Sequence, residues 1–243
     1  MYENYNEYNN YQEQRTYNPE RVNVQTILTK AFLFMFLALL ITGITALIVA
    51  NSVTENGAIG RFIYGNKWSF VIFLILELVI VFACNSAMSK NNLTLSAVLF
   101  FVYSIVNGLT LSVIFLVYTT TSITRVFFIA SAIFGVMACI GAFTKINLSR
   151  LGPILLVGLI CLIVAEIINI FIGSTTMDMI ISAVGVLVFV GLTAYDVQKI
   201  KNLPMTHQGY DENVLGLYGA MELYLDFINL FLYLLRLFGN AKD

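Results

Sequence analysis

Residues 219–238 read GAMELYLDFINLFLYLLRLF, a run that is long and apolar enough to cross a lipid bilayer. Four polar residues lie within it: Glu222, Asp226, Asn229 and Tyr233. At about 100° per residue, these four fall inside a sector of roughly 60° on one side of a helix. A carboxylate inside a membrane costs about 2.5–3.5 kcal/mol, so this polar side should contact protein or water rather than lipid. We therefore predict a central helix with other helices packed around it.

The composition indicates a membrane protein. Of the 243 residues, 59% are hydrophobic and 11% are charged, and the mean hydropathy is +0.84. Soluble domains average about 25% charged residues, so the chain is expected to cross a membrane several times. The net charge of −1 and the absence of a Lys/Arg cluster argue against a nucleic-acid partner.

The apolar runs predict an all-α membrane protein with seven transmembrane helices in one domain, residues 30–243. Each run is close to the roughly 20 residues that a bilayer requires. They cover 31–50, 68–88, 93–118, 126–143, 151–172, 178–197 and 219–238. Residues 1–29 form a polar tail rich in Tyr and Asn, which we expect to be disordered and which could hold a docking site for a protein partner.

The distribution of Lys and Arg predicts that the amino end lies in the cytoplasm. With that orientation the inner side receives eight basic residues and the outer side receives five, in accordance with the positive-inside rule. The side of the carboxyl end stays open, because Arg236 and Lys242 would also suit a last helix that re-enters the membrane.

Four predicted spans each carry a carboxylate: Glu77, Glu166, Asp196 and Asp226. Carboxylates in a membrane are costly and seldom serve packing alone, and no Lys or Arg stands in the middle of a span to neutralise them. We expect them to bind protons, to bind cations or to face water, which points to ion handling. The candidates for an ion pathway are Glu77, Glu166, Glu222 and Asn229.

Asp196 and Asp226 are the predicted pH-sensing pair. Both lie in the same half of the membrane if the sixth and seventh helices run antiparallel, so the two side chains could meet. Two carboxyl groups in contact cannot both ionise cheaply, so they share a proton and their contact depends on pH. Opening the contact would expose two acidic groups, and hard cations such as Ca²⁺ take oxygen ligands.

Two segments resemble a known family. Residues 191–200 read GLTAYDVQKI, residues 220–231 read AMELYLDFINLF, and residues 234–236 read LLR. They are similar to the signature of the Bax inhibitor family, the transmembrane BAX-inhibitor-motif proteins, and specifically to its bacterial members. The resemblance implies six helices wrapped around the carboxyl-terminal one, in a bacterial plasma membrane. It also implies a pH-sensitive Ca²⁺ leak gated by an aspartate pair at Asp196 and Asp226, which would touch Ca²⁺ transiently.

The chain departs from some family members, which carry an Arg late in the second span that helps to hold the aspartate pair. That region here reads CNSAMSK, residues 84–90, without an Arg, so either Lys90 reaches the pair from the inner end of the span or the pair has no basic partner. This departure leaves the set point of the pH response open.

Two other functions fit part of the pattern. An intramembrane aspartyl protease also has Tyr-Asp in the sixth span and Asp in the seventh, but Asp226 follows Tyr224-Leu225 rather than the Gly-x-Gly of such proteases. A regulatory membrane protein would act through partners, with the carboxylates serving the fold. Since no phosphate loop, zinc-ligand spacing or activated nucleophile is present, we expect neither enzymatic activity nor a cofactor.

Overall fold

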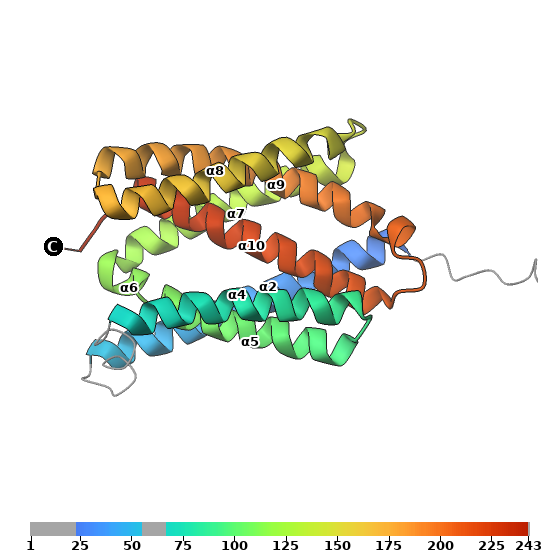
Figure 1. Cartoon of the computed structure of the whole chain (residues 1–243), viewed down its shortest axis with the longest axis horizontal. Helices are drawn as coiled ribbons and strands as arrows, with labels where there is room; N and C mark the ends of the chain where they lie inside the picture. The colour runs from blue at the N-terminus through green and yellow to red at the C-terminus, as the bar shows by residue number, and fades with distance from the viewer. Residues whose placement is uncertain (1–22, 55–66, 243) are drawn as a thin grey trace, which may run out of the picture.

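The computed structural model describes residues 23–54 and 67–242, and its regular structure there is helical apart from one bridge between Tyr118 and Ala241 (Figure 1). Residues 1–22, which form most of the predicted tail, and Arg61 lie outside the described residues. The helices are α2 (Val24–Thr54), α4 (Lys67–Ser89), α5 (Leu93–Leu111), α6 (Ile114–Val117), α7 (Thr120–Phe143), the 3-10 turn η1 (Leu148–Arg150), α8 (Leu151–Ile172), α9 (Thr175–Thr206) and α10 (Glu212–Phe238).

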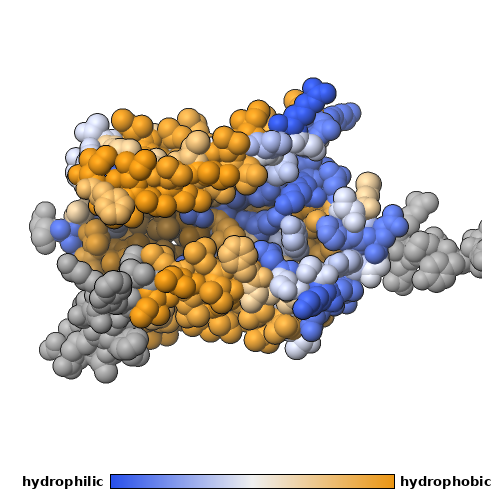
Figure 2. Space-filling model, viewed as in Figure 1, coloured by the Kyte–Doolittle hydropathy of each residue, from blue (hydrophilic) through white to orange (hydrophobic). Residues whose placement is uncertain are grey.

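The outer surface of the bundle is apolar. Six candidate spans, α2, α4, α5 with α6, α7, α8 and α9, are long and apolar enough to cross a membrane. Their outward faces carry large side chains such as Phe82 and Phe171, which are 72% and 85% exposed. Figure 2 shows this apolar surface over most of the face in view, with hydrophilic residues gathered at the end where α2 begins. A soluble monomer rarely exposes so much contiguous apolar surface, so the chain is an integral, multi-pass membrane protein.

Helix α10 occupies the centre of the bundle, as predicted. It packs against α2, α4, α5, α7 and α9, and Leu217, Leu223 and Leu230 on it are completely buried. It runs from the end where α2 begins to the opposite end (Figure 1). Helix α8 differs from the predicted arrangement, because it packs mainly on α9 and reaches α10 through an ion pair between Glu166 and Arg236. Surrounding protein allows α10 to carry polar residues that lipid would not tolerate.

Helix α9 is longer than predicted. It ends at Thr206 rather than near Val197, so only residues 207–211 connect it to α10. Its apolar face continues through the buried Ile200 and Leu203, which keeps the helix packed after the hydropathy falls. Pro204 lies in the last turn, where it removes the backbone donor that would bond to the Ile200 oxygen, and the helix ends two residues later.

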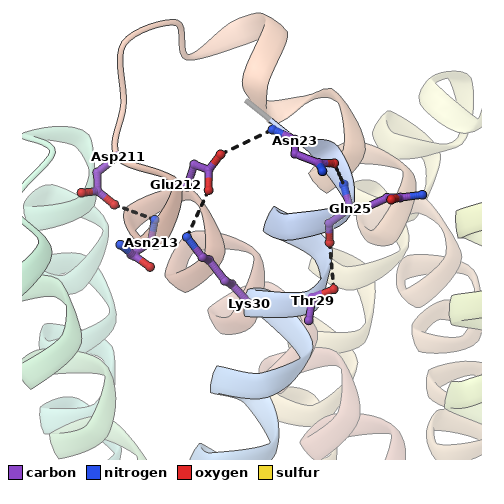
Figure 3. A network of polar contacts seen from close by, with 7 residues as sticks. All are labelled: Asn23, Gln25, Thr29, Lys30, Asp211, Glu212 and Asn213. Carbon is purple, nitrogen blue, oxygen red and sulfur yellow. Dashed lines mark hydrogen bonds and ion pairs between the residues drawn. The ribbon is translucent and has the colours of Figure 1, made fainter. Parts of the chain in front are cut away.

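Helix α2 begins at Val24, before the boundary at residue 30 that the composition suggested. Its first turns are tied to the start of α10 (Figure 3). The Lys30 ammonium lies 3.1 Å from the Glu212 carboxylate, and the Asn23 backbone N–H donates to the other oxygen of that carboxylate at 3.4 Å. The start of α2 and the start of α10 are therefore held together by an ion pair and a hydrogen bond.

Helices α7 and α9 approach each other very closely at Gly141. A Cβ atom on this residue would lie 2.3 Å from the backbone oxygen of Ala194, on the turn of α9 that also carries Asp196. Only glycine allows this approach, because the neighbouring atoms belong to backbone and cannot rotate away. The position of Asp196 is thus fixed by direct backbone contact between α7 and α9.

Candidate functional site

Asp196 on α9 and Asp226 on α10 meet inside the bundle. They are 8% and 4% exposed, and their carboxyl groups lie within hydrogen-bonding reach of each other. The short connection makes α9 and α10 antiparallel neighbours, and the Gly141 contact holds α9 in register. A hydrogen bond between two carboxyl groups requires that one of them carries a proton. The structure therefore brings together the two residues that the sequence singled out.

A second pair lies one helical turn nearer the start of α10. Lys199 follows Asp196 by three residues and Glu222 precedes Asp226 by four, so both side chains fall on the same face of their helices. The Lys199 ammonium forms an ion pair with Glu222. Tyr218 lies beside this pair, with the Lys199 Nζ atom 5.5 Å from the centre of its ring. We call Asp196, Lys199, Glu222 and Asp226 the acidic cluster.

Lys199 is the basic residue that sequence reasoning missed. Lys90, the basic residue considered on the second span, is exposed in the turn between α4 and α5. The predicted sixth span ends at residue 197, which places Lys199 in the following loop, whereas in the structure it lies within α9. The sequence did hold a signal for its role. Lys199 follows Asp196 by three residues, and residues three apart lie on the same face of a helix.

A cavity with several polar residues in its lining reaches Lys199 of this cluster from the end where α2 begins. Its volume is about 370 Å³, and its lining comprises Ser149, Tyr195, Gln198, Lys199, Asn202, Leu203, Thr206, His207 and Tyr218. Figure 2 shows hydrophilic residues extending from this end into the hollow between α8 and α4. We call this cavity the vestibule. Through Lys199 and Tyr218 it borders directly on Glu222.

The polar side of α10 continues from Asp226 toward the opposite end. Asn229 lies one turn further on, is half-buried, and its amide donates to the Leu225 backbone oxygen at 2.8 Å. Tyr233 follows, with its ring packed where a Cβ on Gly185 would lie, 2.7 Å from that position. The predicted polar stripe therefore lies along one side of α10, and Glu222, Asp226 and Tyr233 on it contact α9.

Glu166, on α8, lies beside the far end of this polar side of α10. Its carboxylate accepts a hydrogen bond of 2.6 Å from the Arg236 guanidinium, and Arg236 lies 5.5 Å above the Tyr233 ring. Sequence alone suggested Glu166 as an isolated carboxylate, while the structure gives it a cationic partner on α10.

Glu77 belongs to a different network. It accepts a 2.6 Å hydrogen bond from Thr110, and it also hydrogen-bonds to Asn107. Asn107 accepts from the Tyr224 hydroxyl at 3.1 Å, and the same hydroxyl lies 2.6 Å from Thr42. Tyr224 points from the side of α10 opposite to the acidic cluster, so the structure does not bring Glu77 to the aspartate pair.

Two oxygen atoms of the acidic cluster lack partners. Asp226 Oδ2 and Glu222 Oε2 are buried, and neither has a hydrogen-bond partner in the described part of the chain. Within residues 23–54 and 67–242, no group of three or more His, Cys, Asp or Glu side chains is placed to hold a metal ion. The cluster therefore offers unpaired acceptors to a proton or a cation but is not a closed metal site.

Comparison with known proteins gives the same family over nearly the whole chain. The family model described as Inhibitor of apoptosis-promoting Bax1 matches residues 24–243. The inner membrane protein YbhL of Escherichia coli K12 is 38% identical over 225 residues, which cover 91% of this chain and 94% of that protein. Uncharacterised proteins of Borreliella burgdorferi and Rickettsia prowazekii are 37% and 38% identical, over 89% and 88% of this chain and 92% and 89% of theirs.

Proposed function

The chain belongs to the Bax inhibitor family, and from that premise we propose that it is a pH-sensitive leak pathway for Ca²⁺, gated by the Asp196–Asp226 pair. The contact between these two buried carboxyl groups is the observation that carries the proposal. The family relation supports the assignment, and the relatives named above are described only as membrane proteins or as uncharacterised.

The gate works through one shared proton. With a single proton the aspartate pair forms a charge-assisted hydrogen bond, which is stronger than a bond between neutral groups. A second proton removes the charge from the bond, and loss of the first proton sets two negative charges in contact. Both changes weaken the tie between α9 and α10, so flux should be lowest where the pair holds one proton. A difference of a few kcal/mol between closed and open states is sufficient for such a population shift.

The polar side of α10 supplies the proposed route. From the vestibule a cation would meet Glu222, the aspartate pair and Asn229 in turn, and then Glu166 beside Arg236. Carboxylate and amide oxygens are the ligands that Ca²⁺ prefers. A route with oxygen ligands but without a closed metal site suits transient contact at Asp196 and Asp226, because conduction requires that the ion can leave again.

The same proposal places α10 as a seventh span and the vestibule on the cytoplasmic side of a bacterial plasma membrane. The lysine and arginine count supports a cytoplasmic amino end, where α2 begins and the vestibule opens. The role is that of a conduit rather than an enzyme, with Ca²⁺ and the lipid bilayer as its partners and without a cofactor.

Flux through the purified protein tests the proposal. The full chain is reconstituted into liposomes that contain a Ca²⁺-sensitive dye, and Ca²⁺ entry is recorded between about pH 5 and pH 8. We expect entry above that of protein-free liposomes, with a rate that changes with pH. Absence of entry at every pH would transfer the function to the second candidate, a regulatory protein that binds a partner through its amino-terminal tail.

A further inference from the structure

Glu77 stands near the middle of α4, among side chains that face lipid. Leu74 and Leu78 beside it are 42% and 60% exposed, whereas Glu77 is half-buried and turned toward α5. Within the described residues no ion pair includes Glu77, and Arg236 on α10 is already bound to Glu166. A carboxylate inside a membrane without a cationic partner is costly, and such a place favours the neutral carboxyl group.

A chain of side-chain contacts leads from Glu77 to α2. The Asn107 side chain on α5 lies within hydrogen-bonding reach of the Glu77 carboxyl group. The Tyr224 hydroxyl on α10 is 3.1 Å from the Asn107 side chain. The same hydroxyl is 2.6 Å from the Thr42 hydroxyl, which in turn lies 2.9 Å from the Ser104 backbone oxygen. The chain therefore joins α4, α5, α10 and α2, and it ends at a group that can only accept.

This chain contains more contacts than hydroxyl hydrogens. Thr42 and Tyr224 have one hydroxyl hydrogen each, yet together they take part in three of its contacts. If Tyr224 donates to the Asn107 oxygen, the hydrogen between the two hydroxyls must come from Thr42. The contact at the Ser104 oxygen is then left without a hydrogen. The Asn107 amide can supply the missing hydrogen, because the hydrogen-bond network decides which of its two amide atoms faces Tyr224.

With the Asn107 nitrogen toward Tyr224, every contact of the chain has a hydrogen. Asn107 donates to Tyr224, and Tyr224 donates to Thr42. The Thr42 hydroxyl is then free to donate to the Ser104 oxygen. The Asn107 oxygen now faces Glu77, and two oxygens in contact require a hydrogen between them, which only a protonated Glu77 can provide.

One oxygen of Glu77 already has a partner. The Thr110 hydroxyl donates to it at 2.6 Å, and the alternative acceptor of this hydroxyl, the Val106 backbone oxygen, is further away at 3.2 Å. This bond leaves the other oxygen to carry the proton. The titratable groups that face Glu77 from α5 and α10, the helices packed on α4, are the phenols of Tyr103 and Tyr224. Both phenols are uncharged at neutral pH, so neither can stabilise a carboxylate by charge.

We propose that Glu77 is a proton-binding site separate from the aspartate pair, and that its neutral carboxyl group gives the first hydrogen bond in a one-way chain from α4 through α5 and α10 to α2. Loss of this proton reverses the chain, so that Asn107 donates to the Glu77 carboxylate and Thr42 donates toward α10. The Ser104 oxygen loses its hydrogen bond from Thr42 in that state. The proton on Glu77 therefore controls a bond between α2 and α5.

The bond that depends on this proton lies where α2 and α5 are in close contact. A Cβ atom on Gly108, one turn from Ser104 on α5, would lie 2.7 Å from the Thr42 backbone oxygen. The two backbones therefore touch at Thr42. A change in hydrogen bonding here bears on the packing of α2 against α5, and it does not involve Asp196 or Asp226.

The first test measures the charge of Glu77 by infrared spectroscopy of the full chain in liposomes at neutral pH. A protonated carboxyl group has a C=O band that is separate from the carboxylate bands and shifts in D₂O. Glu77→Gln should lose intensity in the protonated band. Glu166→Gln is the matched control and should lose carboxylate intensity, because Glu166 is paired with Arg236. Loss of carboxylate intensity in Glu77→Gln would overturn the proposal.

The second test measures stability in detergent as a function of pH. Glu77→Gln replaces the carboxyl hydroxyl by an amide that donates in the same way, so it should melt like the wild type at acidic pH. The wild type should lose stability relative to this variant as the pH rises, because the folded protein then holds a proton that the unfolded chain releases. The aspartate pair is present in both proteins and cancels from the comparison. A difference that stays constant with pH would refute the proton site.

Glu77→Leu separates hydrogen bonding from packing. It fills a similar space without a donor or an acceptor, so it should melt several degrees below both Glu77→Gln and the wild type. If Glu77→Leu melts as high as Glu77→Gln, the chain of hydrogen bonds contributes nothing and the proposal fails. None of these measurements uses Ca²⁺, so their outcome is independent of the flux experiment.

Discussion

Substitution of Gly141 by Ala should lengthen the contact between Asp196 and Asp226, although Gly141 touches neither residue directly. The new Cβ atom would lie 2.3 Å from the Ala194 backbone oxygen, whereas carbon–oxygen contacts require about 3.3 Å. Helices α7 and α9 must therefore separate by about 1 Å, at a cost of about 1–3 kcal/mol for overpacking. Helix α10 is also packed against α2 and α7, so it should stay in place when α9 moves.

The displacement is large compared with the hydrogen bond that it affects. A charge-assisted bond between two carboxyl groups measures about 2.5–2.7 Å, and an added 1 Å takes it beyond 3.5 Å, where it no longer counts as a bond. Gly141→Ala should therefore melt several degrees below wild type and leak Ca²⁺ several-fold faster at the pH where wild-type flux is lowest.

Gly135→Ala is the matched control for this prediction. It makes the same change on the same helix, at a position where a Cβ meets nothing within 4 Å. Melting is followed by tryptophan or dye fluorescence in detergent, and flux in dye-loaded liposomes. If the two variants have equal melting temperatures and equal flux, the close α7–α9 contact does not position Asp196 and the reasoning fails.

Two further predictions concern contacts away from the aspartate pair. Tyr224→Phe removes the hydroxyl shared by Thr42 and Asn107, and at about 0.6 kcal/mol per hydrogen bond inside a membrane it should lower the stability by about 1–2 kcal/mol. The flux of this variant should keep the wild-type dependence on pH, and a flattened profile would show that the network belongs to the sensor. Glu212→Gln weakens the partly exposed pair with Lys30, so chemical unfolding should show a loss of less than about 1 kcal/mol that shrinks further at high salt. A loss above 2 kcal/mol would mean that this tie between α2 and α10 is a principal support of the fold.

The sequence was sufficient to predict the membrane class, the central helix and the pairing of Asp196 with Asp226. Hydropathy identifies spans because the bilayer fixes their length, and the narrow polar stripe on residues 219–238 required a protein environment. Both inferences depend on local periodicity, which a single sequence displays directly.

Hydropathy failed where a helix continues beyond the apolar run. It ended the sixth span near Val197, so Lys199 was assigned to a loop, although Ile200 and Leu203 continue the buried face of α9. The partner of Glu166 was equally hidden, because Arg236 is distant in sequence and meets it only through the packing of α8 beside α9. Contacts between distant segments depend on helix rotation and tilt, which hydropathy does not report.

The pH profile of Ca²⁺ flux in Asp226→Asn, Asp196→Asn and the double variant tests the central claim most directly. All three proteins are reconstituted beside wild type and beside Asp178→Asn, a matched change at the other end of α9, where Asp178 accepts a hydrogen bond from Asn169. Each single variant should fold and show a flattened profile, and the double variant should add little, because both residues act on one shared proton. Asp178→Asn should retain the wild-type profile. A wild-type profile in either single variant would contradict the account, because the aspartate pair would then not be the pH sensor.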